Sequence, residues 1–450
     1  MTHQTNSLHA SVVGAGLAGC EAAWQLANRG IAVTLYEMKP QKYTPAHSYT
    51  GFAELICSNS LKAARVDSAA GMLKEEMRRL GSITMESAQH NQVPAGGALA
   101  VERVGFSDYI TQKIRSHPLI QVVEGEVTSI PEGDVILATG PLTSDALAKE
   151  IQKLVEVGSL SFFDAAAPIV DASTIDRSIV FEASRYGKGD SDDYLNCPMN
   201  KEEYEAFYDA LIHAESAPLH EMDRRDFKVY EGCMPVEVMA KRGEDTLRFG
   251  PLKPVGLTDP RTGHRPWAVV QLRKENREGT MYNLVGFQTN LKWGEQKRVF
   301  SMIPGLAQAE FYRYGVMHRN TFLNSPCLLD RHFCLKKEPR IFFAGQITGV
   351  EGYVESAASG IYTGLNLARK LLGQPLVDLP RETMLGALSL YISDPLVTDF
   401  QPMGSNMGVL PSLPERIRDK KLRYHTIAMR GLDALDACMT EYGLTTLTQL

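Results

Sequence analysis

The 450-residue sequence predicts an α/β fold, in which a parallel β-sheet is interrupted by a mixed α+β insertion and followed by a helical tail. Three observations predict this arrangement. The first 40 residues follow the order strand, glycine-rich turn, helix, strand. Two short apolar segments, DVILATG at 134–140 and RIFFAGQITG at 340–349, are typical of buried parallel strands. The region between them is richer in charge, Tyr and Trp and contains alternating segments, such as WAVVQLRK, that indicate antiparallel strands.

The first of these elements carries the fingerprint of a dinucleotide-binding turn. The segment VVGAGLAG places three glycines in the pattern G-x-G-x-x-G between the first strand and the first helix. In this pattern the first glycine permits a tight turn, the second lets the backbone approach a pyrophosphate, and the third lets the helix pack closely on the strand. Free N–H groups at the start of the helix attract the anion. The expected cofactor-binding residues of the turn are Gly14, Ala15, Gly16, Leu17, Ala18 and Gly19.

Two further features indicate which dinucleotide is bound. Glu37 ends the second strand, IAVTLYE, where a carboxylate can bind ribose hydroxyls. The distal segment FFAGQITGVEGYVESAASG resembles the C-terminal motif of the two-domain flavoproteins, which often have Gly-Asp where this chain has Gly345 and Gln346. A polar loop followed by a small-residue helix can aim a helix N-terminus at a flavin, so we predict FAD rather than NAD. No second G-x-G-x-x-G occurs, and NAD(P)H is expected only as a transient reductant.

The domain organisation follows from these two separated nucleotide-binding segments. We expect a Rossmann-like FAD-binding domain in two parts, 1–165 and 331–450, with residues 166–330 inserted as a domain that faces the substrate. Within the first part, DSAAGMLKEEMRRL at 67–80 has the apolar spacing of an amphipathic helix. The second part ends in the helical tail, most clearly at 413–442.

Composition limits the class of protein. Hydrophobic residues make up 44% and charged residues 22%, as in ordinary globular proteins. The N-terminus does not resemble a secretory signal, and no apolar run approaches the roughly 20 residues of a membrane helix. The seven cysteines are odd in number and scattered, which indicates a reducing cytosol rather than a disulfide framework. We therefore expect a cytoplasmic protein without membrane contact, and the sequence indicates no obligate protein partner.

The charge is distributed unevenly. The whole chain has a net charge of −6, whereas residues 221–340 hold 21 Lys and Arg against 14 Asp and Glu, a net charge of +7. A polyanion can meet such a positive face on an acidic protein. A solvated surface with uneven charge is the commoner explanation.

Two cysteines lie in segments suited to chemistry. Cys57 stands in FAELICSNSLKA, between an apolar run and a Ser-Asn-Ser cluster. Cys233 stands in YEGCMPVEVMAKRG and is followed by Lys241 and Arg242. Cations that fold close to a thiol lower its pKa and favour the nucleophilic thiolate. The spacing alone favours the other interpretation, in which each thiol is buried and inert.

The remaining cysteines indicate packing rather than chemistry. Cys20 lies on the first helix and Cys438 on the tail helix, and each is expected to fill a packing position. Cys327, His332 and Cys334 form only a partial set of metal ligands. Because they lack a fourth ligand and a short C-x-x-C pair, no metal site is predicted.

Six segments in one order resemble those of the bacterial folate- and FAD-dependent tRNA (uracil-5-)-methyltransferases, and they span nearly the whole chain. They are FAELICSNSLKA, PAGGALAVER, EGCMPVEVMAKRG, DTLRFGPLKPVGL, YNLVGFQTNLKWGEQKRVF and AGQITGVEGYVESAASG. The resemblance implies methylation of uridine 54 in the tRNA T loop, with 5,10-methylenetetrahydrofolate as carbon donor and reduced FAD as methylene carrier and reductant. By position it implies that Cys233 is the thiolate that attacks uracil, and that Cys57 protects the carrier or removes the C5 proton.

Other functions remain open at this point. The nearest relatives of that family are flavoproteins that install carboxymethylaminomethyl groups on wobble uridine, and they are longer, with a C-terminal partner-binding region that this chain is expected to lack. An FAD oxidoreductase acting on small molecules would bind neither RNA nor folate. A flavin-bearing RNA-binding protein without turnover would bind tRNA but transfer no methyl group.

The resemblance gives the positive region a function as a face that contacts tRNA phosphates. Trp267 and Trp293 either stack on bases or fill the core of the insertion, and we expect the core because interior aromatics are commoner. The basic segment ERIRDKKLRYHTIAMR is a further RNA contact or a solvated helix face. The candidate RNA-binding residues are Arg261, Arg265, Arg273, Lys274, Lys297 and Arg298.

Overall fold

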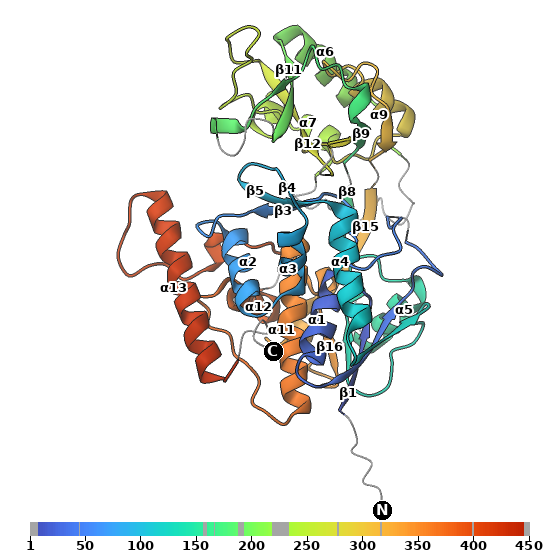
Figure 1. The fold of residues 1–450 in the computed structure, drawn as a ribbon, viewed down its shortest axis with the longest axis vertical. Helices are drawn as coiled ribbons and strands as arrows, with labels where there is room; N and C mark the ends of the chain where they lie inside the picture. The colour runs from blue at the N-terminus through green and yellow to red at the C-terminus, as the bar shows by residue number, and fades with distance from the viewer. Residues whose placement is uncertain are drawn as a thin grey trace, which may run out of the picture.

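The chain folds into two bodies, a larger one formed by both ends of the chain and a smaller one formed by its middle (Figure 1). Each has its own hydrophobic core, drawn from residues 10–155 and 322–439 in the larger body and from 170–309 in the smaller. The interrupted α/β fold is confirmed, and the boundaries at 165 and 330 stay predictions. The computed structural model describes residues 8–44, 46–155, 160–165, 167–187, 193–217, 234–276, 279–315, 317–397 and 400–444.

The larger body is built on a parallel sheet with the strand order β16-β7-β1-β2-β6. Strand β1 (His9–Val13) lies between β2 (Ala32–Glu37) and β7 (Val135–Leu137). Strand β16 (Ile341–Phe343) pairs with β7, and β6 (Ile120–Glu124) pairs with β2. The two apolar segments predicted as strands are therefore neighbours, and the chain returns to the sheet after the insertion. Their carboxyl ends meet that of β1, at the edge where doubly wound sheets bind ligands.

Two helices of this body pack very closely against each other. Helix α1 (Leu17–Ala27) packs against α11 (Tyr353–Leu371), and a Cβ at Gly360 would lie 2.1 Å from the carbonyl oxygen of Ala18. A Cβ at Gly364 would be similarly obstructed by the backbone of α1. The small residues of the distal segment thus bring the two halves of the nucleotide-binding region together. The other elements of this body are α2 (Ala69–Arg79), which confirms the predicted amphipathic helix, α3 (Ile83–His90), α4 (Arg103–Ser116), α5 (Asp145–Val155), α10 (Ser325–Leu328) and α12 (Met384–Ser393), with the small sheet β3 (Ser60–Ala63), β5 (Ala98–Val101) and β4 (Gln92–Val93).

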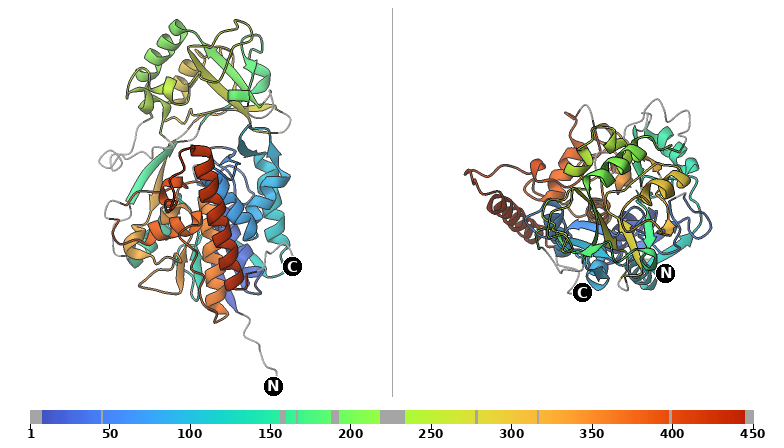
Figure 2. Two further views of the ribbon diagram at one scale, coloured as in Figure 1. Left: turned by 90° about the vertical axis from the view of Figure 1, so that its left-hand side faces the viewer. Right: turned by 90° about the horizontal axis from the view of Figure 1, so that it is seen from above.

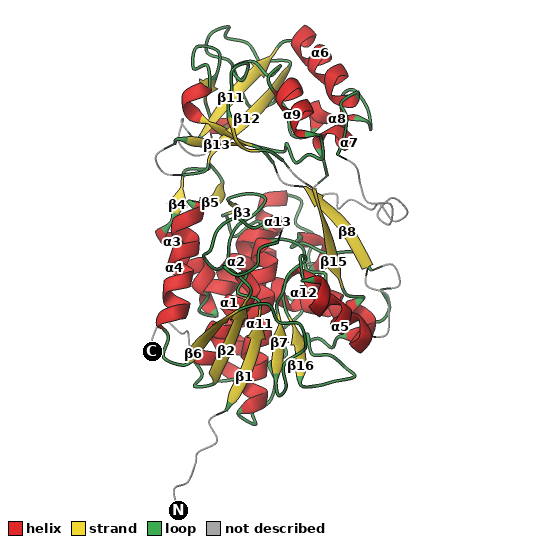
Figure 3. Cartoon of the chain, turned by 90° about the vertical axis from the view of Figure 1, so that its right-hand side faces the viewer, coloured by secondary structure: helices red, strands yellow, loops and turns green. Residues whose placement is uncertain are grey.

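The smaller body is an antiparallel sheet with helices packed on it. The segment WAVVQLRK, predicted as a strand, contains β12 (Ala268–Lys274), which pairs with β13 (Met281–Leu284). An antiparallel pair, β8 (Leu160–Ala165) and β15 (Met317–Phe322), lies between the two bodies (Figure 3). The sheet has the order β10 (Phe181–Glu182), β11 (Tyr194–Met199), β12 (Ala268–Lys274), β13 (Met281–Leu284), β9 (Ile169–Asp171) and β14 (Phe311–Arg313), and the helices are α6 (Lys201–Ile212), α7 (Val236–Ala240), α8 (Thr246–Phe249) and α9 (Trp293–Phe300).

The helical tail lies on the outside of the larger body (Figure 2). Its long helix α13 (Lys420–Glu441) begins later than the predicted residue 413, because the preceding segment contains prolines and Asp419 caps the helix by accepting the N–H of Leu422 at 2.6 Å. None of the helices in the described part of the chain has the length and apolarity needed to span a lipid bilayer.

Candidate cofactor and thiol site

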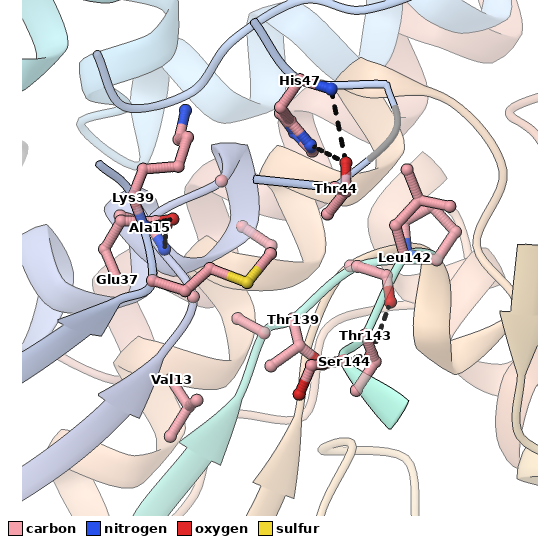
Figure 4. A pocket seen from close by; sticks show the side chains of 18 of the residues that line it. Val13, Ala15, Glu37, Lys39, Thr44, His47, Thr139, Leu142, Thr143 and Ser144 are labelled. Carbon is pink, nitrogen blue, oxygen red and sulfur yellow. Dashed lines mark hydrogen bonds between the residues drawn. The ribbon is translucent and has the colours of Figure 1, made fainter. Parts of the chain in front are cut away.

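A pocket lies at the carboxyl ends of β1, β7 and β16, and together with the solvent at its mouth it has a volume of about 1110 Å³ (Figure 4). Its walls come from segments far apart in the sequence, including 13–18, 36–39, 138–144 and 345–346. Figure 4 shows residues of 13–15 and 139–144 at the strand ends and residues of 37–47 from the end of β2 onward around the same space. All predicted cofactor residues except Gly19 line the pocket, namely Gly14, Ala15, Gly16, Leu17, Ala18, Glu37, Gly345 and Gln346.

The three glycines of the turn have three different spatial roles. Gly14 has a φ of +99°, and a Cβ there would lie 2.6 Å from the carbonyl oxygen of Ala138. A Cβ at Gly19 would lie 1.7 Å from the carbonyl oxygen of Gly14, so α1 packs directly on the turn. A Cβ at Gly16 would have no neighbour within 4 Å. Gly16 thus leaves open the space that a pyrophosphate needs beside the backbone, and the turn fits a dinucleotide.

Glu37 joins the end of β2 to the turn. Its carboxylate accepts the N–H of Ala15 at 2.8 Å and the N–H of Lys39 at 3.0 Å. A carboxylate has about four acceptor positions, so two such bonds leave lone pairs for ribose hydroxyls. Glu37 therefore fixes the turn and can still accept hydrogen bonds from ribose hydroxyls.

The segment after β2 adds pocket residues that the sequence analysis missed. The Lys39 ammonium donates to the carbonyl oxygens of Tyr49 and Gly51 at 2.9 and 2.6 Å, and its side chain lines the pocket. Thr44 and His47 also line it, with 2.6 Å between the Thr44 hydroxyl and His47 Nδ1. Burial lowers the pKa of His47, which favours a neutral ring. This segment has no motif, and its only sequence signal is its place directly after the acidic strand end.

The distal segment approaches the pocket from the other side. Gly345 has a φ of +84°, and its N–H donates to the Ser359 hydroxyl at 2.7 Å. The Gln346 amide donates to the Glu351 carboxylate at 2.9 Å. Both pocket residues are thus held by side chains of their own segment.

Cys57 is partly exposed and lies beside Tyr353, a residue of the pocket wall. Its Sγ is 3.0 Å from the Tyr353 hydroxyl oxygen, which also accepts the Cys57 N–H at 2.7 Å. Burial, followed by the nearby charge of Cys57, raises the pKa of Tyr353 well above its ordinary value. The phenol therefore stays protonated and can donate a hydrogen bond to the sulfur. Ile56, the neighbour of Cys57, lines the pocket as well.

The loop that carries this thiol is held in place by charged side chains that are buried or half-buried. Arg103 donates to the carbonyl oxygens of Leu55 and Ile56 and forms a 2.5 Å ion pair with Glu275 of the smaller body. Arg313, also from the smaller body, donates to the carbonyl oxygen of Ile56. Residues of both bodies thus determine where the loop lies.

Arg273 belongs to this fastening rather than to an outer face, which corrects its prediction as a phosphate contact. It is 6% exposed because β12 is covered on both sides. Its guanidinium donates to the Asn59 side chain at 2.9 Å and to the Ser58 hydroxyl at 2.8 Å. A buried guanidinium with these partners is not available to RNA.

The other candidate RNA-binding residues lie nearer the surface. Arg261 pairs with Asp259 at 2.7 Å and Arg298 with Glu295 at 2.6 Å, so both guanidiniums already have a carboxylate neighbour. Lys274 is half-buried. Among the described residues, the exposed candidates without a salt bridge are Arg265 and Lys297.

The two tryptophans of the smaller body are not core residues. Trp293 is 64% exposed, so the prediction that it fills the core is wrong. Trp267 is 37% exposed, and its ring lies 3.7 Å from the Arg248 guanidinium. Both aromatic side chains lie at the surface because they occupy the ends of elements rather than inward-facing strand positions.

The remaining thiol predictions have different outcomes. Cys20 and Cys438 are buried, which confirms them as packing residues. Cys233 lies outside the described residues, so its meeting with Cys57 stays a prediction. Within the described ranges, no group of three or more His, Cys, Asp and Glu side chains is placed to hold a metal ion.

One pocket formed by the sheet edge, the glycine turn and the distal segment defines a dinucleotide-binding α/β protein with an inserted domain. The model of the family "Glucose inhibited division protein A" matches residues 9–375. The methylenetetrahydrofolate–tRNA-(uracil-5-)-methyltransferase TrmFO of Acetivibrio thermocellus is 60% identical over 434 residues, which cover 96% of this chain and 99% of that protein. TrmFO of Enterococcus faecalis is 59% identical over 423 residues, covering 94% and 97%.

A solved structure agrees with these matches at the level of the fold. Aquifex aeolicus GidA in its form I crystal superposes with a TM-score of 0.67 and 16% identity, covering 98% of this chain and 78% of that one. On the family model and the close relatives, the chain belongs to the glucose inhibited division protein A family and, within it, to the TrmFO methyltransferases.

Proposed function

We propose that the protein methylates C5 of a uridine in tRNA, with 5,10-methylenetetrahydrofolate as the carbon donor and FAD in the pocket described above. The observation that carries the proposal is the identity of about 60% to relatives named for this activity over nearly the full length of both chains. The pocket supports it, because the open space at Gly16 suits a pyrophosphate and a thiol lies beside the wall. We further propose uridine 54 of the T loop as the target and NAD(P)H as the reductant.

FAD, when bound, supplies the one-carbon carrier and the reducing equivalents, while the protein supplies binding and proton transfer. Uracil C5 is a poor nucleophile until a thiolate adds to C6 and moves electron density onto C5. We assign this addition to Cys233, because it stands in the segment EGCMPVEVMAKRG that resembles the family motif. Once C5 has bonded to the one-carbon unit, a base removes the C5 proton as the bond from that carbon to its carrier breaks, which leaves a methylene group on C5. Two electrons and a proton, which reduced FAD would supply, convert the methylene to a methyl group, and the C5=C6 double bond re-forms as the thiolate leaves.

Cys57 and Tyr353 can together accept and hold a proton at the pocket wall. The Tyr353 O–H can stabilise the ionised sulfur at 3.0 Å, and the sulfur can then take up a proton. Arg103 and Arg313, anchored on carbonyl oxygens of the same loop, add positive charge that favours a thiolate. We propose that this pair either removes the C5 proton or protects the carrier from water.

The RNA must deliver its target base to the pocket. A stacked base has to be extruded, at a cost of a few kcal/mol, before it can meet a buried cofactor. We propose that exposed cations of the smaller body, Arg265 and Lys297 among them, hold the phosphates around it.

A reconstituted reaction tests the proposal. Unmodified tRNA transcript, FAD, NAD(P)H and methylenetetrahydrofolate labelled in its one-carbon unit are mixed with the protein, and nucleosides of the product are separated. Label is expected in 5-methyluridine, and a transcript with cytidine at position 54 serves as the control. Absence of label from uridine C5 in the complete reaction would refute the proposal.

The thiol assignments can be separated with matched variants. Cys233→Ala is expected to abolish transfer with FAD still bound, and Cys57→Ala to lower transfer strongly. Cys327→Ala is the control, because Cys327 is a free and exposed cysteine away from the pocket wall. Full activity of Cys233→Ala would contradict its role as the nucleophile.

A further inference from the structure

An exposed indole begins helix α9. Trp293 is 64% exposed at the first position of the helix, and its neighbours Lys292 and Lys297 are exposed on the same surface. A single exposed aromatic residue is common on protein surfaces, so the case for a ligand at Trp293 depends on what surrounds the ring.

The indole is the outer end of a column of aromatic rings. The ring of Trp293 stacks on that of Tyr314, with centroids 5.8 Å apart and an angle of 16° between the planes. Tyr314 stacks in turn on Phe311 at 5.1 Å and 18°. Phe311 contacts Phe300, which is fully buried in the core of the smaller body. The column therefore runs from the core to an indole with an accessible surface.

Hydrogen bonds hold this column in a fixed position. Gln296 is fully buried, and its amide donates to the carbonyl oxygens of Leu291 and Gly315 at 2.7 and 2.8 Å. It also accepts the N–H of Gly315 at 2.8 Å. The start of α9 and the segment after β14 are thus joined before any ligand arrives, which lowers the entropy cost of binding.

The column is connected to the thiol loop. Arg313 precedes Tyr314 in the chain and donates to the carbonyl oxygen of Ile56, a residue of the pocket wall beside Cys57. Lys297 makes no salt bridge in the part of the chain that the structure describes, so a cation is available next to the exposed indole. An aromatic face with a cation beside it suits a nucleobase and its phosphate.

We propose that Trp293, backed by Tyr314, is a stacking platform for a nucleobase of the RNA substrate. The inference rests on the proposed function, because extrusion of the target uridine leaves its neighbouring bases without a stacking partner. The indole replaces that partner and holds the RNA in register with the pocket. Trp293 is thus a positioning residue, and the stacking tolerates any base because every base has a π-face.

Tryptophan fluorescence gives a direct test, because the chain contains only Trp24, Trp267 and Trp293. Addition of unmodified tRNA is expected to quench the emission, and Trp293→Phe is expected to remove most of that quenching while keeping tRNA affinity. Trp293→Ala is expected to raise the Kd for tRNA by about fivefold or more, from the loss of one base-stacking contact. Trp267→Ala is the matched control and is expected to keep both quenching and affinity.

Flavin absorbance and the melting temperature report whether each variant is folded. If Trp293→Ala, folded and loaded with FAD, binds and methylates tRNA as the wild type does, the platform is refuted while the proposed function stands. If tetrahydrofolate alone produces the Trp293-dependent quenching and tRNA does not, the platform belongs to the folate and the inference is also overturned. If the wild type transfers no label but tRNA still quenches Trp293, the proposed function fails and the platform stands.

Discussion

The two bodies of the chain contribute to the site in different ways. In the larger body the contacts are made by small residues, since Gly19 and Gly360 bring α1 against the turn and against α11 with no room for a Cβ. The smaller body reaches the site with long charged side chains, such as Arg273 and Arg313, which hydrogen-bond the loop of Cys57. The comparison shows that the cofactor pocket is shaped by backbone packing within one body, whereas the thiol beside it is positioned by both.

The largest expected effect on cofactor binding comes from filling the open space in the glycine turn. Gly16→Val places methyl groups where a Cβ has no neighbour within 4 Å, so the fold is retained while the pyrophosphate position is blocked. We expect FAD affinity to fall on the order of 100-fold, as steric overlap of about 3 kcal/mol would produce. Flavin absorbance after gel filtration measures FAD retention, and circular dichroism measures whether the fold is kept.

The control for this variant is Gly97→Val, at an exposed glycine whose Cβ would also meet nothing within 4 Å but which lies outside the pocket. It is expected to keep its flavin. Retention of FAD by Gly16→Val would mean that the cofactor does not bind at the turn. The claim that backbone packing in the larger body shapes the cofactor pocket would then be wrong.

The second prediction breaks the connection between the bodies. Arg103 and Glu275 form an ion pair whose side chains are 16% and 2% exposed. Removing one partner leaves an uncompensated buried charge, so Arg103→Met is expected to destabilise the protein by about 3–5 kcal/mol. The double variant Arg103→Met/Glu275→Met is expected to recover much of that loss, as measured by urea unfolding.

An exposed ion pair serves as the control for the Arg103 and Glu275 variants. Lys153 and Glu150 lie 2.7 Å apart with side chains 74% and 37% exposed, and Lys153→Met is expected to leave stability nearly unchanged. Equal losses for Arg103→Met and Lys153→Met would show that the buried pair does not join the two bodies energetically.

The parts of the site that could be predicted from the sequence are those encoded by residues close together. The turn at 14–19 and the carboxylate of Glu37 follow from a strand, a helix and a glycine spacing, each of which is local. The resemblance to a known family singles out Cys57, but the sequence does not reveal which side chains surround it. Its partner Tyr353 is 296 positions away in the sequence, and no periodicity or motif connects the two.

The residues of the smaller body were harder to assign, because charge in a sequence does not reveal exposure. Arg273 and Lys297 look alike in the sequence as basic residues that each precede a second basic residue, yet Arg273 is buried on β12 and Lys297 is exposed on α9. Trp293 shows the opposite case, an aromatic residue expected in the core that lies at the surface. Only tertiary packing distinguishes these alternatives, and it depends on contacts made across the whole chain.

The third prediction concerns pH and compares buried carboxyl groups in the two bodies. Glu76 accepts the N–H groups of Met384 and Leu385 at the start of α12, and burial raises its pKa to about 8 from an ordinary value of 4.5. The folded protein therefore holds a proton that the unfolded chain has released between these values. The stability from this group is complete below pH 4.5 and is lost as the pH rises toward 8.

Replacement of this group should flatten the pH dependence. We expect the stability of the wild type relative to Glu76→Gln to fall as the pH is raised from 5 to 8. Thermal unfolding of both proteins in matched buffers measures this difference. Burial also raises the pKa of Glu237 in the smaller body, so Glu237→Gln should show a change of the same sign. Parallel curves for the wild type and Glu76→Gln would show that the carboxyl group titrates normally.

The smallest expected effect distinguishes available cations from paired ones on a single helix. Each cation that neutralises a tRNA phosphate contributes about one unit to the slope of log affinity against log salt concentration. Lys297→Ala is expected to lower that slope by about one, because Lys297 has no salt bridge among the residues described. Arg298 must leave Glu295 to reach a phosphate, so Arg298→Ala should lower it less. If both variants leave the slope unchanged, α9 does not contact the RNA backbone, and the smaller body acts on the site only through the buried side chains that hold the thiol loop.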